Sequence, residues 1–193
     1  MILSPRQRYK KTNGISILEV KVRSVGQLFD SRDPAPFRDR DLDDDFTDYI
    51  VSSVEEMNHK VPFEMKIYIT ESPADMTAET IILSIQDYFN YQIELQKIKF
   101  SKILSTARLF LLLALFTLAV CLLVAKWVEK IQSGFVSSTL REGIVIFGWV
   151  SMWKPLELLL FDWYPVYDRI RLYRDILKAP KQVVFENLTS VKK

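Results

Sequence analysis

The most marked hydrophobic pattern of the chain lies in its second half. From Leu109 to Ala125 the sequence reads LFLLLALFTLAVCLLVA, seventeen residues without a charge, bounded by Arg108 and Lys126. A bilayer core needs about 20 mostly apolar residues, and long basic side chains at the ends of a short run reach out to the headgroups. The pattern therefore predicts a transmembrane helix over residues 104–126.

A second apolar stretch, over residues 143–163, follows an expected external loop over 127–142. Lys154 and Pro155 interrupt it. If this stretch is a transmembrane helix, Lys154 lies near the bilayer midplane. The alternative is a re-entrant or interfacial segment that is broken at Pro155. Aromatic residues at its far end, beginning with Trp163, are typical of the headgroup region and favour the span.

Three shorter runs have the character of β-strands. Residues 15–25 and 64–70 alternate apolar and polar positions, and residues 181–186 are rich in β-branched and aromatic side chains. We expect the third run to return to the N-terminal sheet, because its apolar side chains would otherwise be exposed on a tail.

Helical periodicity predicts two helices around these strands. One begins near Asp41 and ends near Met57, with its apolar residues on one face. The second is capped by Thr77, and no Pro or Gly occurs from there to Ala125, so it runs unbroken into the first apolar segment. Gln92 interrupts a strict heptad and disfavours a coiled-coil stalk.

Together these elements predict a small cytoplasmic α+β domain joined to a two-helix transmembrane hairpin. The expected order is a flexible basic N-terminus over 1–14, the domain and a stalk helix over 15–103, the hairpin, and a basic juxtamembrane helix with a returning strand over 164–193. Basic residues beside the spans outnumber those of the loop nine to three, which predicts that both termini are cytoplasmic.

Composition narrows the chemistry that the chain can support. Residues 1–96 carry a net charge of −6 and residues 97–193 a net charge of +8. The chain has one cysteine, Cys121, and one histidine, His59, which excludes a disulfide framework, paired-cysteine zinc sites and multi-histidine metal centres. We interpret Cys121 as a small apolar residue and His59 as a dipole partner at a helix end, and we expect no enzymatic activity and no cofactor.

An acidic cluster over residues 39–48 is the most conspicuous polar feature. The EF-hand interpretation fails, because Asp44 stands where that loop needs glycine and Ile50 where it needs a bidentate glutamate. We interpret the cluster as an acidic first helical turn with Arg38 and Arg40 as counter-charges, and a Mg²⁺ site or a surface for a basic partner is the alternative. The carboxylates of that surface would be Asp41, Asp43, Asp44 and Asp45.

Two charged features lie in or beside the membrane segments. Lys154 and Glu157 are three residues apart on one helix and can pair, either as a structural pair buried in an oligomer or as part of an ion or proton path. In a re-entrant segment, the third alternative, both charges stay in water. The amphipathic helix after the second span indicates contact with anionic lipid headgroups rather than nucleic acid. Its basic residues are Arg169, Arg171, Arg174 and Lys178.

Four segments are distinctive without being motifs of known chemistry: residues 28–37, 141–143, 148–157 and 162–165. Through them and the acidic helix start, the chain resembles a group of uncharacterised bacterial two-pass membrane proteins. The resemblance implies a bacterial inner-membrane location and supplies no activity.

Two functions are compatible with these features. We expect a non-enzymatic accessory or scaffold subunit of a membrane complex, and the alternative is an oligomeric transport or conductance component that uses Lys154 and Glu157. The expected partners are the bilayer with its anionic headgroups and either further copies of the chain or a heterologous membrane protein.

Overall fold

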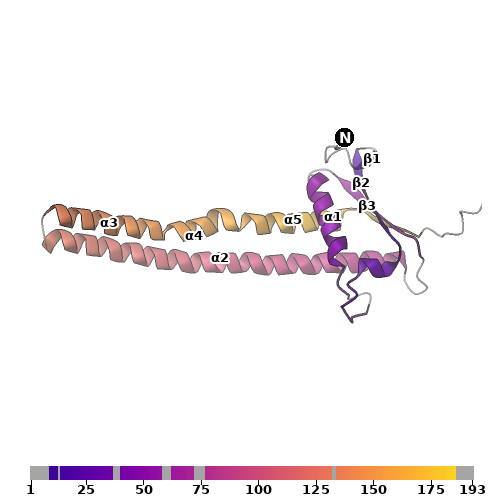
Figure 1. Ribbon diagram of the computed structural model, residues 1–193, viewed down its shortest axis with the longest axis horizontal. Coiled ribbons are helices and arrows are strands. Elements are labelled where there is room, and N and C mark those ends of the chain that lie inside the picture. Colours follow the sequence, from indigo (N-terminus) through magenta and orange to yellow (C-terminus); the bar gives the residue numbers. More distant parts are fainter. Residues whose placement is uncertain are drawn as a thin grey trace, which may run out of the picture. The chain divides into compact units, whose positions relative to one another are not determined.

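The chain forms two compact units (Figure 1). The computed structural model describes residues 9–12, 14–36, 40–57, 62–71, 77–131 and 134–185. Residues 1–95 and 170–193 make up the first unit, here called the α/β unit. Residues 96–169 make up the second, here called the helical hairpin.

The α/β unit is built on a mixed sheet with the strand order β1-β2-β3-β4. In the described residues these strands are β1 (Lys10–Thr12), β2 (Ile15–Val22), β3 (Phe63–Ile69) and β4 (Lys181–Phe185). β1 is antiparallel to β2, whereas β2–β3 and β3–β4 are parallel pairs. Strand β1 corrects the expectation of a flexible stretch over 1–14, because backbone pairing with β2 orders three residues of it, next to a turn where Gly14 has φ +82°.

One face of the sheet is buried beneath helices. Alternate residues of β2 and all odd-numbered residues of β3 are buried. The connections from β2 to β3 and from β3 to β4 each move the chain to the next strand in the same direction across the sheet. Because such crossovers are right-handed, their helices lie on the same face of the sheet. The helices of the α/β unit are α1 (Asp44–Met57), the beginning of α2 (Ala78–Ile131) and the end of α5 (Tyr164–Lys178). The expected combination of strands and helices is confirmed, although strands and helices alternate along the chain.

The return of the C-terminal strand is also confirmed. Lys181–Phe185 pairs with β3 from Met65 to Ile69. Because β3 and β4 are neighbours in the sheet, the whole helical hairpin is inserted between two paired strands.

Helix α2 is one unbroken helix of 54 residues, as expected, and its backbone is about 81 Å long at 1.5 Å per residue. The Oγ1 atom of Thr77 accepts a hydrogen bond from the backbone N–H of Thr80 at 3.2 Å, which confirms Thr77 as its N-cap. Helix α3 (Phe135–Ser151) begins only four residues after α2 ends. The expected loop over 127–142 is therefore wrong: Lys, Glu and Arg end the apolar run, but they are good helix formers and do not end the helix.

The second apolar segment is helical but irregular. Helix α3 is followed by a turn at Met152, helix α4 (Trp153–Glu157) and a π-helix, η3 (Leu158–Asp162). Pro155 lies in the first turn of α4, where backbone N–H groups have no partner within the helix and a missing one costs little. The break at Met152 therefore accommodates the proline. The expected helical segment over 143–163 is thus present with a turn at Met152, and the chain stays helical past Pro155 rather than turning back.

Candidate functional site

Small residues line the contact between the two helices of the hairpin, which lie side by side in Figure 1. A Cβ atom added at Gly148 of α3 would lie 3.0 Å from the Cβ of Cys121 and 3.0 Å from Cδ1 of Leu118, both on α2. We call this contact the hairpin seam. Its buried residues include Ala107, Ala114, Cys121 and Ala125 on α2, with Gly148 and Pro155 opposite.

The seam fixes the depth of Lys154 in the hairpin. Gly148 is level with Cys121. Pro155 lies seven residues after Gly148, and because the two helices are antiparallel, the residue of α2 at the same level lies seven residues before Cys121, which is Ala114. Ala114 lies three residues, or about 5 Å along the helix, from the centre of the seventeen-residue apolar run. Lys154, the neighbour of Pro155, therefore lies close to the middle of the apolar segment.

Lys154 and Glu157 form the ion pair that the sequence predicts. The Nζ atom of Lys154 donates a hydrogen bond to Oε2 of Glu157 at 2.9 Å. The side chains remain 56% and 42% exposed, because neighbouring Pro155 faces the seam and turns the pair away from α2. In hydrocarbon a charged side chain at mid-depth is unfavourable by about 2.5–3.5 kcal/mol on insertion scales, so an exposed pair in such surroundings would need cover.

The ion pair lies in the middle of a longer row of exposed residues. Their spacing alternates between three and four residues, as at the contact positions of a coiled coil. We call this row the charged stripe; it consists of Leu140, Gly143, Phe147, Val150, Lys154, Glu157 and Phe161. A second exposed row on the same segment has only apolar residues: Ile146, Trp149, Trp153, Leu156 and Leu160.

One end of the charged stripe opens into an apolar groove between α2 and α3. Its volume is about 510 Å³. The groove is lined by Val120, Cys121 and Val124 from α2 and by Thr139, Leu140, Gly143, Ile144 and Phe147 from α3. Three of these residues belong to the stripe, so groove and stripe form one continuous surface.

Ionic and aromatic contacts lie toward the two ends of the apolar segments. At the turn of the hairpin, Arg141 of α3 pairs with Glu129 of α2 at 3.7 Å, a partner that sequence reasoning missed. Toward the α5 end, the ring of Trp163 lies 6.4 Å from that of Phe100 and 5.9 Å from that of Tyr167, centroid to centroid. Trp163 and Tyr167 belong to the aromatic group expected beyond the second span, and Phe100 of α2 is an addition to it.

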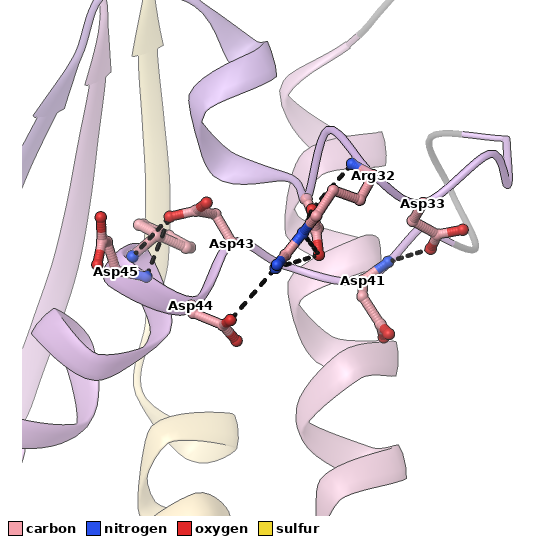
Figure 2. A network of polar contacts seen from close by, with 8 residues as sticks. Arg32, Asp33, Asp41, Asp43, Asp44 and Asp45 are labelled. Carbon is pink, nitrogen blue, oxygen red and sulfur yellow. Dashed lines mark hydrogen bonds and ion pairs between the residues drawn. The ribbon is translucent and has the colours of Figure 1, made fainter.

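Next to the acidic cluster lies a cation that sequence reasoning missed, Arg32, which contacts Asp30 and the cluster residue Asp44 (Figure 2). Its guanidinium forms a two-pronged contact with the carboxylate of Asp30, with Nη2 2.8 Å from Oδ2, and lies 3.4 Å from Asp44. Arg32 holds the pKa of Asp30 below its ordinary value. Of the two expected counter-charges, Arg40 donates a hydrogen bond to the carbonyl of Ala35 at 3.1 Å, and Arg38 lies outside the described residues.

Asp33 of the preceding loop and Asp43 of the cluster bind backbone N–H groups. Asp33 accepts from the backbone N–H of Ala35 at 2.9 Å. It also accepts from that of Asp41 at 2.9 Å, and Asp43 accepts from Asp45 and Phe46 at the start of α1 (Figure 2). Asp43 is therefore the N-cap, so α1 begins three residues later than expected. The exposed aspartates among the described residues of the cluster are Asp41, Asp44, Asp45 and Asp48. Within the described ranges, no three carboxylate, thiol or imidazole groups gather as a metal site would require.

Helix α5 owes its amphipathic pattern, in part, to the α/β unit. Leu172, Tyr173 and Ile176 are buried there. The four basic residues expected at the lipid surface are exposed: Arg169, Arg171, Arg174 and Lys178. His59, expected at a helix end, lies outside the described residues.

Lys181 is a further residue that sequence reasoning missed. Its Nζ atom donates to the carbonyl oxygens of Ile176 at 2.8 Å, Leu177 at 3.0 Å and Ala179 at 3.2 Å. The first residue of β4 thus caps the C-terminal end of α5. No pattern within either element indicates this contact, because it depends on the turn between them.

Comparison of the chain with protein-family models, with curated proteins and with solved structures gives no match.

Proposed function

We propose that this chain is an integral membrane protein that crosses a bilayer twice and serves as a non-enzymatic accessory or scaffold subunit of a membrane complex. One observation carries the membrane assignment. Two helical segments are long and apolar enough to span, yet only 17% of the apolar window of each is buried within the protein. A core helix of a soluble protein would bury most of that window, so these surfaces require another apolar environment.

The topology supports a scaffold. The helical hairpin leaves the sheet after β3 and returns to it at β4, so both membrane helices connect to neighbouring strands. A ligand of the α/β unit is thereby held at the membrane through two helical connections instead of one flexible linker. The exposed carboxylates Asp41, Asp44 and Asp45 offer a basic partner an acidic surface on that unit.

Charge distribution supports an orientation with both termini in the cytoplasm of a bacterium and the hairpin embedded in its inner membrane. Arg169 follows the aromatic residue Tyr164 by five residues, about 8 Å along α5, and lies within reach of lipid headgroups.

Cysteine labelling tests the membrane assignment and the orientation. In a Cys121→Ala background, a cysteine at exposed Ser138 near the hairpin turn should react with an impermeant maleimide in intact cells. A cysteine at exposed Ser52 of α1 should react only after lysis. The reverse pattern would overturn the orientation, and release of the chain by alkaline carbonate would overturn membrane insertion.

Co-purification tests the scaffold role. Native membranes solubilised in mild detergent should yield a heterologous protein in stoichiometric amounts with the tagged chain. Replacing Asp41, Asp44 and Asp45 together by Asn should release that protein, whereas replacing Glu55 of α1 by Gln should not. Purification without any heterologous protein would contradict the proposal.

A second candidate function, transport or conductance, is favoured by the exposed Lys154–Glu157 pair near mid-depth and the adjoining π-helix, since π-helical turns are frequent at functional sites. Purified protein in liposomes should then pass ions or protons, and Lys154→Leu with Glu157→Leu should abolish the flux without loss of assembly. Tight liposomes with the unaltered protein would exclude this function.

A further inference from the structure

The two exposed rows of the α3–η3 segment differ in the environment they require. The row from Ile146 to Leu160 is apolar throughout and suits lipid. The charged stripe instead presents an ammonium and a carboxylate at mid-depth, and the seam with α2 does not cover them. A protein surface with polar groups at the same depth is the cover that such a pair needs in a bilayer.

We propose that the charged stripe binds the charged stripe of a second copy of this chain, with the two copies parallel and related by a two-fold axis along the membrane normal. This inference rests on the proposed insertion into a bilayer. Such an interface uses the same patch on both copies, as two-fold symmetry requires.

Charge complementarity identifies a second copy as the occupant. Each stripe carries one cation and one anion, so two stripes together are neutral. Every charge then has one opposite charge on its own copy and one on the other copy. Lys154 and Glu157 differ in depth by three residues, about 4.5 Å, a distance that a lysine side chain spans. Each ammonium therefore reaches the carboxylate of the other copy while keeping its own, which removes the exposed pair from lipid.

The shape of the surface is consistent with this arrangement. The residues of the stripe follow the three- and four-residue spacing of helices that pack in parallel at a small angle. At Gly143 nothing lies within 4 Å of an added Cβ, and the groove of about 510 Å³ begins there. The groove provides room for apolar side chains of the second copy next to Leu140 and Phe147.

Disulfide cross-linking tests the face that makes the contact. In a Cys121→Ala background, Val150→Cys places a thiol on the charged stripe and Leu160→Cys places one on the apolar row. The native side chains at these positions are 63% and 60% exposed, so the two sites are matched. Oxidation in native membranes should link most Val150→Cys chains into dimers and few Leu160→Cys chains. Equal linking at both sites, or linking of Val150→Cys only to a different protein, would overturn the proposal.

Reciprocal charge changes test the identity of the occupant. Lys154→Glu gives a stripe with two anions, and Glu157→Lys gives a stripe with two cations. Each variant alone should self-associate at least about tenfold less than the unaltered chain, because like charges then face each other. Co-expressed with different tags, the two variants should purify together as a mixed dimer. Failure of the mixed pair to associate, with both variants retained in the membrane, would refute pairing between copies.

The outcomes separate this inference from the function proposed above. Retention in carbonate-washed membranes together with monomeric behaviour in native nanodiscs would refute the dimer and leave the membrane assignment intact. Release by carbonate would refute the membrane assignment itself. Capture of a heterologous partner through the acidic surface is independent of both results.

Discussion

Gly148 lies so close to α2 that an added Cβ would stand 3.0 Å from the Cβ of Cys121. This approach makes the two helices neighbours at backbone distance, as small residues do in membrane helix pairs. The cysteine therefore contributes through its small size, and its thiol is not needed for the contact.

Gly148→Val should destabilise the hairpin by about 1–3 kcal/mol, because the Cβ of Cys121 is fixed to its helix and cannot yield to a branched side chain. Thermal unfolding in detergent measures the change. Gly143→Ala is the matched control, since nothing lies within 4 Å of that position, and it should leave the midpoint unchanged or slightly raised. Equal midpoints for the two variants would show that the seam does not bring the helices this close.

Lys181→Met should destabilise the α/β unit by about 1–3 kcal/mol, because three carbonyl oxygens near the end of α5 lose their donor. Denaturant unfolding of the detergent-solubilised chain measures the effect. Lys178→Met, at an exposed position on the same helix, should change stability by less than about 0.5 kcal/mol. A smaller loss at position 181 than at position 178 would contradict the capping role.

The same lysine makes stability depend on pH. Burial lowers the pKa of Lys181 to about 8 from its ordinary value of 10.5. The folded chain then binds this proton less tightly than the unfolded chain, so the contribution to stability rises with pH from about 8 to 10.5 and is constant below 8. Unfolding measured from pH 7 to 10.5 should show a steeper rise for the unaltered chain than for Lys181→Met. Parallel curves would place the pKa of Lys181 at its ordinary value.

Asp43→Ala should cost about 1 kcal/mol, because the N-terminal turn of α1 loses the acceptor for the N–H groups of Asp45 and Phe46. Asp45→Ala removes only a favourable charge near the helix dipole and should cost a few tenths of a kcal/mol. Unfolding midpoints of the two variants make the comparison. An effect of the same size for both would assign the cluster a role other than capping.

Deletion of residues 181–193 should expose the edge of β3 and make residues 62–71 more sensitive to protease. Ile67 and Ile69, which are fully buried, pair with β4 in the intact sheet. Limited proteolysis of membranes compares the truncated chain with the full chain. Identical fragments at identical rates would mean that β4 adds nothing to the stability of the sheet.

Local patterns determined much of this fold. The apolar runs, the alternation in β2 and β3 and the cap at Thr77 each reflect a preference that acts within a few residues, so the sequence predicts these elements correctly. The return of β4 also follows from the sequence, because three consecutive apolar residues, Val183 to Phe185, need a surface to cover them. The i,i+3 spacing of Lys154 and Glu157 likewise predicts their ion pair.

The tertiary structure alone decided which distant groups meet. The helical residues 127–131 of α2 and 135–142 of α3 differ from the expected loop, because charge marks the end of an apolar run and not the end of a helix. Strand β1 exists only through its pairing with β2, and Arg32 meets Asp30 and Asp44 because of the course of the loop. The depth and exposure of Lys154 follow from the contact of Gly148 with Cys121. These features depend on which residues of two separate segments lie opposite each other. No single segment encodes that, because packing energy arises only when the surfaces of both segments come together.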